Sequence, residues 1–214
     1  MEIYETEEEQ VAAIKRWWKE NGISTIIGVV IGIIAIVGWD FWQNNVKEHA
    51  KQASALYDQL QISLSKDNDE SVAAISKKIN ENYADSAYAS YAALYLAKTK
   101  VKQNDLEAAK SILEQQMNTV ESDEVRNIAR FRFIRLLYAT GENEKGLQLI
   151  AETDQTTIKE FVTSYDELKG DLYVALGRLG EARTAYQSAL REGGESPLLQ
   201  FKLDDIAVVE NVVN

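Results

Sequence analysis

The feature that most constrains this chain is an uncharged run near its start. Residues 22–39 read GISTIIGVVIGIIAIVGW, which is 18 residues without a charged side chain. This length predicts a transmembrane helix, because about 20 apolar residues cross the hydrocarbon core of a bilayer. Trp18 and Trp39 bracket the run, and tryptophan favours both membrane interfaces. The alternative is the buried core helix of a soluble domain, which rarely has tryptophan at both ends.

Basic residues give the predicted orientation of this span. Lys15, Arg16 and Lys19 precede it, whereas the first basic residue after it is Lys47. The positive-inside rule therefore predicts a cytoplasmic N-terminus and an external C-terminal body. The exit reads A-I-V-G-W-D-F-W, which is too bulky for signal-peptidase cleavage. We therefore predict an uncleaved, single-pass signal anchor at residues 22–42.

Two glycines within the span have the spacing of a helix–helix contact. Gly28 and Gly32 form the motif G-V-V-I-G. Small residues four positions apart let two membrane helices approach closely, so this pair predicts a contact with a second copy or with a partner membrane protein. The alternative is that glycine is simply common in membrane helices.

The segment before the span, residues 1–21, is predicted to be a cytoplasmic amphipathic helix. Val11, Ile14 and Trp18 fall on one helical face, and Thr6 with Glu9 has the spacing of a capping box. Such a helix lies at the membrane interface, and we expect Gly22 to turn the chain into the bilayer. It is either a recognition element or a membrane-proximal helix without a partner.

The body after the span shows helical periodicity and an internal repeat. Only one proline occurs in the whole chain, at position 197, which favours an all-α fold. Three units align at four positions. These positions are a small one (Ala97, Ile134, Gly170), a turn (Asn104, Gly141, Gly177), a second small one (Ala109, Gly146, Ala182) and a large one (Leu113, Ile150, Tyr186). The alternative is a set of unrelated helical hairpins.

This register is that of tetratricopeptide-like helical hairpins stacked into an α-solenoid. Ile134 is large at a small position, which predicts looser packing in the middle hairpin, and Asn104 with Glu107 has capping-box spacing. The residues expected to pack the repeats closely are Ala97, Ala109, Gly141, Gly146, Gly170, Gly177, Ala182, Tyr186 and Ala189.

The predicted repeat domain covers residues 43–206. Residues 44–83 form a degenerate first pair, with a turn over residues 66–71, and no proline or glycine separates Trp39 from Tyr83. The span is therefore expected to continue into the first helix of the domain. A helix after Pro197 is expected to cap the last hairpin, followed by a tail at residues 207–214.

The composition argues against catalysis and against cofactors. The chain has no cysteine, and His49 is its only histidine, so thiolate and multi-histidine metal sites are excluded. The nucleotide-binding and nucleophile motifs are absent, and the acidic stretch at residues 67–70 lacks the spacing of a calcium loop. A net charge of -11 argues against binding to nucleic acid. We predict a non-enzymatic interaction protein without a cofactor or a metal.

Binding is expected on the concave side of the array, which the first helix of each hairpin lines. The alternative is that most of the aromatic residues there pack between repeats. The predicted groove residues are Tyr91, Lys98, Phe131, Arg135, Tyr138, Glu167 and Asp171.

The opening M-E-I-Y-E-T-E-E-E-Q-V-A-A-I-K-R-W-W-K-E-N-G, the glycine-rich span and G-W-D-F-W together resemble the ancillary SecYEG translocon subunit family. The resemblance is most specific in residues 1–42 and 170–206. It implies a single-pass protein of the bacterial inner membrane with a periplasmic tetratricopeptide-like domain. The implied partners are the SecYEG translocon, a membrane-anchored periplasmic chaperone of the parvulin type, translocating polypeptides and the lipid bilayer.

The function implied by this resemblance is a scaffold that assists the hand-over of proteins emerging from the channel. Two alternatives remain open. The cytoplasmic segment could regulate an envelope stress-response protein, or the hairpins could serve as an adaptor for a cell-envelope enzyme.

Overall fold

The structure is a computed structural model that describes residues 7–154, 158, 160–193 and 197–213. In this part of the chain every regular element is a helix, which confirms the all-α prediction. The helices are α1 (Glu7–Ser65), α2 (Asp69–Asn82), α3 (Ala87–Lys102), α4 (Leu106–Thr119), α5 (Asp123–Ala139), α6 (Asn143–Ala151), α7 (Val162–Ala175), α8 (Leu179–Arg191) and α9 (Pro197–Val213). Two compact units, Met1–Gln52 and Ala53–Asn214, divide the chain. Each unit is described by itself.

The first unit consists of the long N-terminal part of α1. The helix passes through Gly22 without a break, so the turn expected there is absent. The indole of Trp18 covers Gly22, and a Cβ at this glycine would lie 3.3 Å from the ring. The helix continues because glycine weakens a helix by only about 1 kcal/mol, which the neighbouring apolar residues readily offset. Thr6, the proposed cap, lies outside the described residues.

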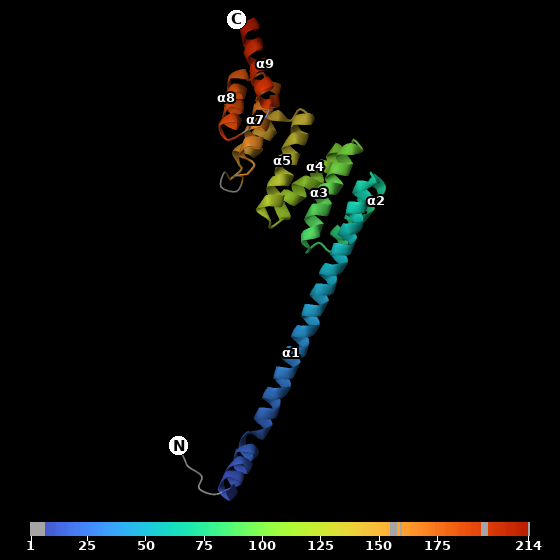
Figure 1. Ribbon diagram of the computed structural model, residues 1–214, viewed down its shortest axis with the longest axis vertical. Helices are drawn as coiled ribbons and strands as arrows, with labels where there is room; N and C mark the ends of the chain where they lie inside the picture. Colours follow the sequence, from blue (N-terminus) through green and yellow to red (C-terminus); the bar gives the residue numbers. More distant parts are fainter. Residues whose placement is uncertain (1–6, 155–157, 159, 194–196, 214) are drawn as a thin grey trace. The chain divides into compact units, whose positions relative to one another are not determined.

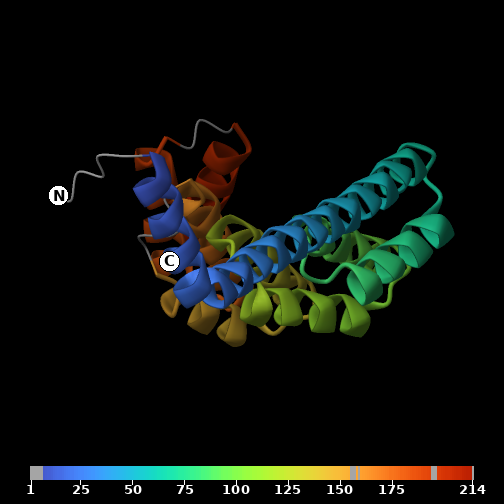
Figure 2. The same ribbon diagram turned by 90° about the horizontal axis from the view of Figure 1, so that it is seen from below.

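The second unit is a row of antiparallel helical hairpins. The end of α1 from Ala53 pairs with α2, then α3 with α4, α5 with α6, and α7 with α8, and α9 follows. In this unit the colours follow the order of the sequence in both views, so hairpins adjacent in sequence are adjacent in space (Figures 1 and 2). We refer to the first helix of each hairpin as helix A and to the second as helix B.

The four hairpins share one turn geometry. Each turn contains a residue with left-handed φ, namely Asp67 (54°), Asn104 (61°), Gly141 (79°) and Gly177 (71°), at successive steps of 37, 37 and 36 residues. The amide of the following residue donates to the carbonyl five positions earlier, at 3.0, 2.9, 2.8 and 2.9 Å in chain order. This is the 6→1 bond of a Schellman motif. Glycine, asparagine and aspartate are the residues that adopt this conformation most easily.

The N-terminal cap of α4 lies at Asp105, one residue later than the predicted cap at Asn104. Asn104 is the left-handed turn residue, and Asp105 caps α4 by accepting a hydrogen bond from the amide of Ala108 at 3.3 Å. A left-handed residue ends the preceding helix, so the next residue is the first that can cap the following one.

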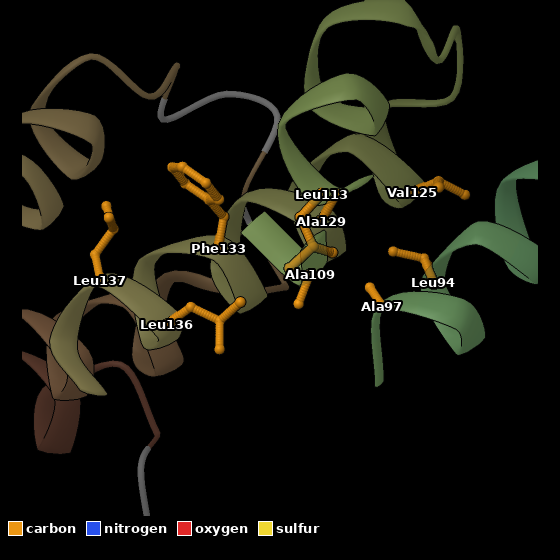
Figure 3. Close-up of a cluster of buried hydrophobic side chains, with 9 residues drawn as sticks. All are labelled: Leu94, Ala97, Ala109, Leu113, Val125, Ala129, Phe133, Leu136 and Leu137. Carbon is orange, nitrogen blue, oxygen red and sulfur yellow. The ribbon is translucent and has the colours of Figure 1, made fainter. Parts of the chain in front are cut away.

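The hydrophobic core is divided into clusters that join neighbouring hairpins. The cluster in Figure 3 combines Leu94 and Ala97 of α3 with Ala109 and Leu113 of α4 and with residues of α5 that include Ala129. Two further clusters likewise join both helices of one hairpin to helix A of the next. A fourth joins α8 to α9. Each hairpin therefore buries its apolar surface against the next, as expected for a solenoid.

The middle hairpin is not loosely packed, in contrast to the expectation for Ile134. This side chain is 0% exposed. A Cβ added to Gly146 of the facing helix would lie 3.5 Å from Ile134 and 3.0 Å from Leu172. In the last hairpin the sizes are reversed, because Gly170 on helix A faces the ring of Tyr186 on helix B. A large residue on one helix is thus accommodated by glycine on the other.

Candidate binding groove

Three A helices of the second unit each expose one apolar side chain at an equivalent position. These side chains lie three positions before the turn residues Asn104, Gly141 and Gly177. They are Val101, Tyr138 and Val174, which are 40%, 42% and 40% exposed. Equivalent positions in three successive hairpins therefore present apolar surface to solvent. We call these three residues the apolar row. Of these three residues only Tyr138 was predicted from the sequence, although the same spacing from the turn residues marks Val101 and Val174.

A charged position lies one helical turn before each residue of the apolar row. It is occupied by Lys98 in α3, Arg135 in α5 and Asp171 in α7. Lys98 and Arg135 line the same hollow of about 470 Å³ between α3 and α5, together with Val101, Leu136 and the guanidinium-bearing Arg132. We call this hollow the cationic hollow. The structure thus brings together two of the predicted groove residues and adds one that was missed.

Arg132 is fixed in place by the backbone of the preceding hairpin. Its Nη1 donates to the carbonyl oxygen of Leu94 at 3.2 Å. Burial lowers the pKa of Arg132 below its ordinary value, and the adjacent charge of Arg135 acts in the same direction. Its charge is nevertheless retained at neutral pH, because arginine starts from a very high pKa. The side chain therefore keeps a positive charge at the wall of the hollow.

The acidic groove residues of α7 are engaged within the chain. Lys202 of α9 reaches Glu167 at 2.8 Å and Asp171 at 2.7 Å, and the hydroxyl of Tyr186 donates to Asp171 at 2.7 Å. Burial works against the charged form of Lys202, but the hydrogen bonds to Asp171 and Glu167 outweigh it and raise the pKa of the ammonium. These carboxylates therefore already have a cationic partner.

The aromatic groove residues lie in separate contacts. Tyr91 is partly exposed beside Tyr57, with ring centroids 6.4 Å apart. Phe131 is half-buried and packs edge-on against Tyr165 at 5.6 Å, and the guanidinium of Arg135 lies 6.0 Å from its ring centroid. Tyr91 and Phe131 thus combine packing with limited exposure.

The residues expected to pack the repeats occupy two kinds of position. Gly141 and Gly177 are the exposed left-handed residues of two turns, where a Cβ would meet no neighbouring atom within 4 Å. The others are buried between helices: Ala97, Ala109, Gly146, Gly170, Ala182, Tyr186 and Ala189.

The first unit exposes its apolar side chains. α1 is long and apolar enough to cross a membrane, and only 6% of its most apolar 18-residue stretch is buried. A core helix of a soluble domain would be mostly buried. Gly28 and Gly32 both lie in α1, and a Cβ at either would have open space around it.

Comparison with known proteins identifies the class of this fold. Residues 15–208 match the family model of the tetratricopeptide repeat-like domain. The chain is therefore a tetratricopeptide repeat-like protein that carries an apolar N-terminal helix. Among solved structures, MamA from Desulfovibrio magneticus RS-1 (residues 41 to the end) has a similar fold, with a TM-score of 0.59, 13% identity and coverage of 74% of this chain and 85% of that one. At this identity the similarity concerns the fold alone.

Two curated relatives define the particular family. The ancillary SecYEG translocon subunit of Escherichia coli (strain K12) is 26% identical over 211 residues, covering 97% of this chain and 100% of the relative. The protein of the same name from Haemophilus influenzae (strain ATCC 51907 / DSM 11121 / KW20 / Rd) is 30% identical over 202 residues, covering 94% and 97%. The chain belongs to the ancillary SecYEG translocon subunit family, as the resemblance noted in its sequence implied.

Proposed function

We propose that this chain is a non-enzymatic, membrane-anchored subunit that associates with the SecYEG translocon. The observation that carries the proposal is the nearly full-length similarity to relatives named for this role, which includes the apolar helix as well as the repeat domain. Hairpin arrays of this kind present surfaces to other polypeptides. A scaffold role is consistent with that property.

The proposed anchor is residues 22–42 of α1, in a bacterial inner membrane. Lys15, Arg16 and Lys19 before the span favour a cytoplasmic N-terminus and a periplasmic repeat domain. Gly28 and Gly32 are proposed to contact a membrane helix of the translocon, because their lack of side chains allows close approach.

The proposed task of the repeat domain is to receive polypeptides as they emerge from the channel. It would pass them on together with a membrane-anchored chaperone of the parvulin type. Anchoring both proteins in one membrane raises their effective concentration, so that a modest groove is sufficient for a transient hand-over.

The association is tested by purification of the tagged full-length chain from membranes in mild detergent. We expect SecY to copurify, and we expect Gly28→Leu combined with Gly32→Leu to reduce its recovery. The matched control is Val30→Leu combined with Ile34→Leu, which has the same spacing on another face of α1. Absence of SecY from the wild-type eluate would contradict the proposal, and equal losses in both double variants would contradict the assignment to the glycines.

The hand-over is tested with a photo-crosslinking residue at Tyr138. Adducts with a translocating chain or with the chaperone are expected, and their absence contradicts the role of the groove. Deletion of residues 2–14 examines the regulatory alternative. If SecY recovery persists while an envelope stress response is lost, the cytoplasmic segment carries a separate function.

A further inference from the structure

The cationic hollow is an exception in an acidic chain. The net charge is -11, yet Lys98, Arg132 and Arg135 converge on one hollow between α3 and α5. Among the described residues, none of the three forms an ion pair with a carboxylate. Arg132 instead donates to a backbone carbonyl, and Arg135 stacks over Phe131. Among the described residues, Arg132 and Arg135 therefore have no carboxylate in ion-pair contact, and Lys98 interacts with Asp67 only at longer range.

Other lysines of the second unit, in contrast to the cations of the hollow, form ion pairs with carboxylates. Lys102 reaches Asp67 at 2.6 Å and Asp69 at 2.9 Å, and these two carboxylates line a second hollow together with Lys98. Lys110 reaches Glu142 at 2.5 Å. These two lysines of the α3–α4 hairpin thus have carboxylate partners, whereas no cation of the hollow forms an ion pair with a described carboxylate.

The equivalent charged position in the last hairpin shows how such a charge is balanced. Asp171 is at the same place relative to its turn as Lys98 and Arg135, and Lys202 of α9 neutralises it at 2.7 Å. A side chain from another helix of the same chain thus supplies the opposite charge there. No described residue forms such an ion pair with Lys98 or Arg135, so both side chains are free to meet an acidic group of another molecule.

The walls of the hollow are apolar as well as cationic. Ala97, Val101, Leu113, Leu136 and Ala139 line it beside the three cations. A small hydrated anion would leave these carbon atoms exposed to water, whereas a polypeptide can cover them with its own apolar side chains. The apolar row continues from Val101 to Tyr138 in the next hairpin, so a segment that crosses the A helices meets a similar surface at each step.

We propose that the cationic hollow binds a polypeptide segment in which acidic side chains alternate with apolar ones. This inference rests on the proposed function in that the ligand is a polypeptide, and it adds a charge preference. Lys98 and Arg135 bind the carboxylates, and Arg135 is suited to a bidentate contact because its guanidinium is planar. The apolar side chains pack against Val101 and Leu136.

The binding test uses the full-length protein in neutral detergent and fluorescent 12-residue peptides. One peptide combines leucine with glutamate, a second replaces each glutamate by glutamine, and a third replaces it by lysine. We expect the glutamate peptide to bind at least tenfold more tightly than the lysine peptide by fluorescence anisotropy, after subtraction of binding to empty micelles. Added salt should weaken the glutamate complex. Equal affinity for the glutamate and lysine peptides overturns the proposal.

Variants locate the binding to the hollow. Lys98→Gln and Arg135→Gln should each weaken binding of the glutamate peptide about fivefold or more. Lys78→Gln is the matched control, since Lys78 is exposed on α2 and does not line the hollow. Arg132 is left unchanged because it also holds the backbone at Leu94. An unchanged affinity in both Lys98→Gln and Arg135→Gln, with wild-type circular dichroism, overturns the assignment.

SecY recovery measured on the same preparations separates the two proposals. If SecY copurifies but the glutamate peptide does not bind, the charge preference is wrong and the translocon association stands. If the glutamate peptide binds through Arg135 but SecY is not recovered, the groove assignment stands and the translocon association fails.

Discussion

At the scale of single residues, Gly170 and the ring of Tyr186 make a close contact in the last hairpin. Tyr186 is 2% exposed, and its hydroxyl donates to Asp171, so the ring cannot move aside easily. A Cβ at Gly170 would overlap this ring. We expect Gly170→Ala to lower the free energy of unfolding by about 2 kcal/mol, as is typical of overpacked cores. Urea unfolding followed by far-UV circular dichroism measures this change.

The matched control for Gly170→Ala is Gly180→Ala. Gly180 is exposed in the first turn of α8, and a Cβ there meets no atom within 4 Å. The alanine should be neutral or stabilise by up to about 1 kcal/mol, because it is a better helix former. Similar losses of stability in both variants would contradict the packing explanation.

A second residue-scale prediction concerns pH. Lys110 donates a hydrogen bond to Glu142 and holds the pKa of this carboxyl below its ordinary value of 4.5. Because the folded-state pKa is depressed, the stabilising contribution is complete above the unfolded-state pKa and is lost as the pH falls through the folded-state pKa. Glu142→Gln should therefore reduce the loss of stability between about pH 6 and pH 3.

This difference is read from urea midpoints at several pH values. Glu114→Gln, a change at an exposed residue of α4, is the control and should follow the wild-type curve. An identical pH dependence in Glu142→Gln and in the wild type would show that the ion pair does not contribute to acid sensitivity.

At the scale of elements, each hairpin depends on one left-handed residue. Gly177 has a φ of 71° and open space around a Cβ, so alanine there is strained by conformation and not by a clash. We expect Gly177→Ala to cost about 1 kcal/mol, which is the usual penalty for this region. Asn104→Gly, at the equivalent position with a φ of 61°, should be neutral or mildly stabilising. In urea unfolding, a Gly177→Ala variant as stable as the wild type, or a clearly destabilised Asn104→Gly variant, would contradict the shared turn geometry.

At the scale of the whole molecule, the two units have different sources of stability. The buried apolar residues of the described chain begin at Ala53, and the four core clusters use residues from Leu56 to Ile206. A fragment beginning at Lys47 should therefore be soluble without detergent and keep the urea midpoint of the full chain. Size-exclusion chromatography and circular dichroism measure both properties. A fragment that aggregates or unfolds earlier would contradict the independence of the second unit.

Sequence periodicity predicted the helices and their order because it reports on local geometry and on burial along one face. The turns at Asn104, Gly141 and Gly177 were found because left-handed turns favour few residue types. The turn at residues 66–71 was also predicted, but the equivalence of Asp67 with the other three turn residues was missed, since its flanking residues do not carry the small-residue pattern. The step of 37 residues back from Asn104 was the signal that could have found it.

Pairwise packing and long-range charge pairs could not be predicted. The size of Ile134 was misjudged because its facing residue, Gly146, lies on another helix and compensates for it. Glu167 and Asp171 were assigned to the groove by their helical register, but Lys202 reaches them from more than 30 residues away. Such contacts depend on the stacking of hairpins, which one sequence does not reveal.

The packing of α9 against the last hairpin bears on how copies of this protein meet. Leu199 and Ile206 cover Ala182, Tyr186 and Ala189, which is the surface that a further hairpin would use. A solenoid with a bare end can accept the start of another copy, and such head-to-tail contacts do not close on themselves but grow into filaments. By occupying that end, α9 terminates this mode of growth and leaves lateral surfaces for association with other molecules.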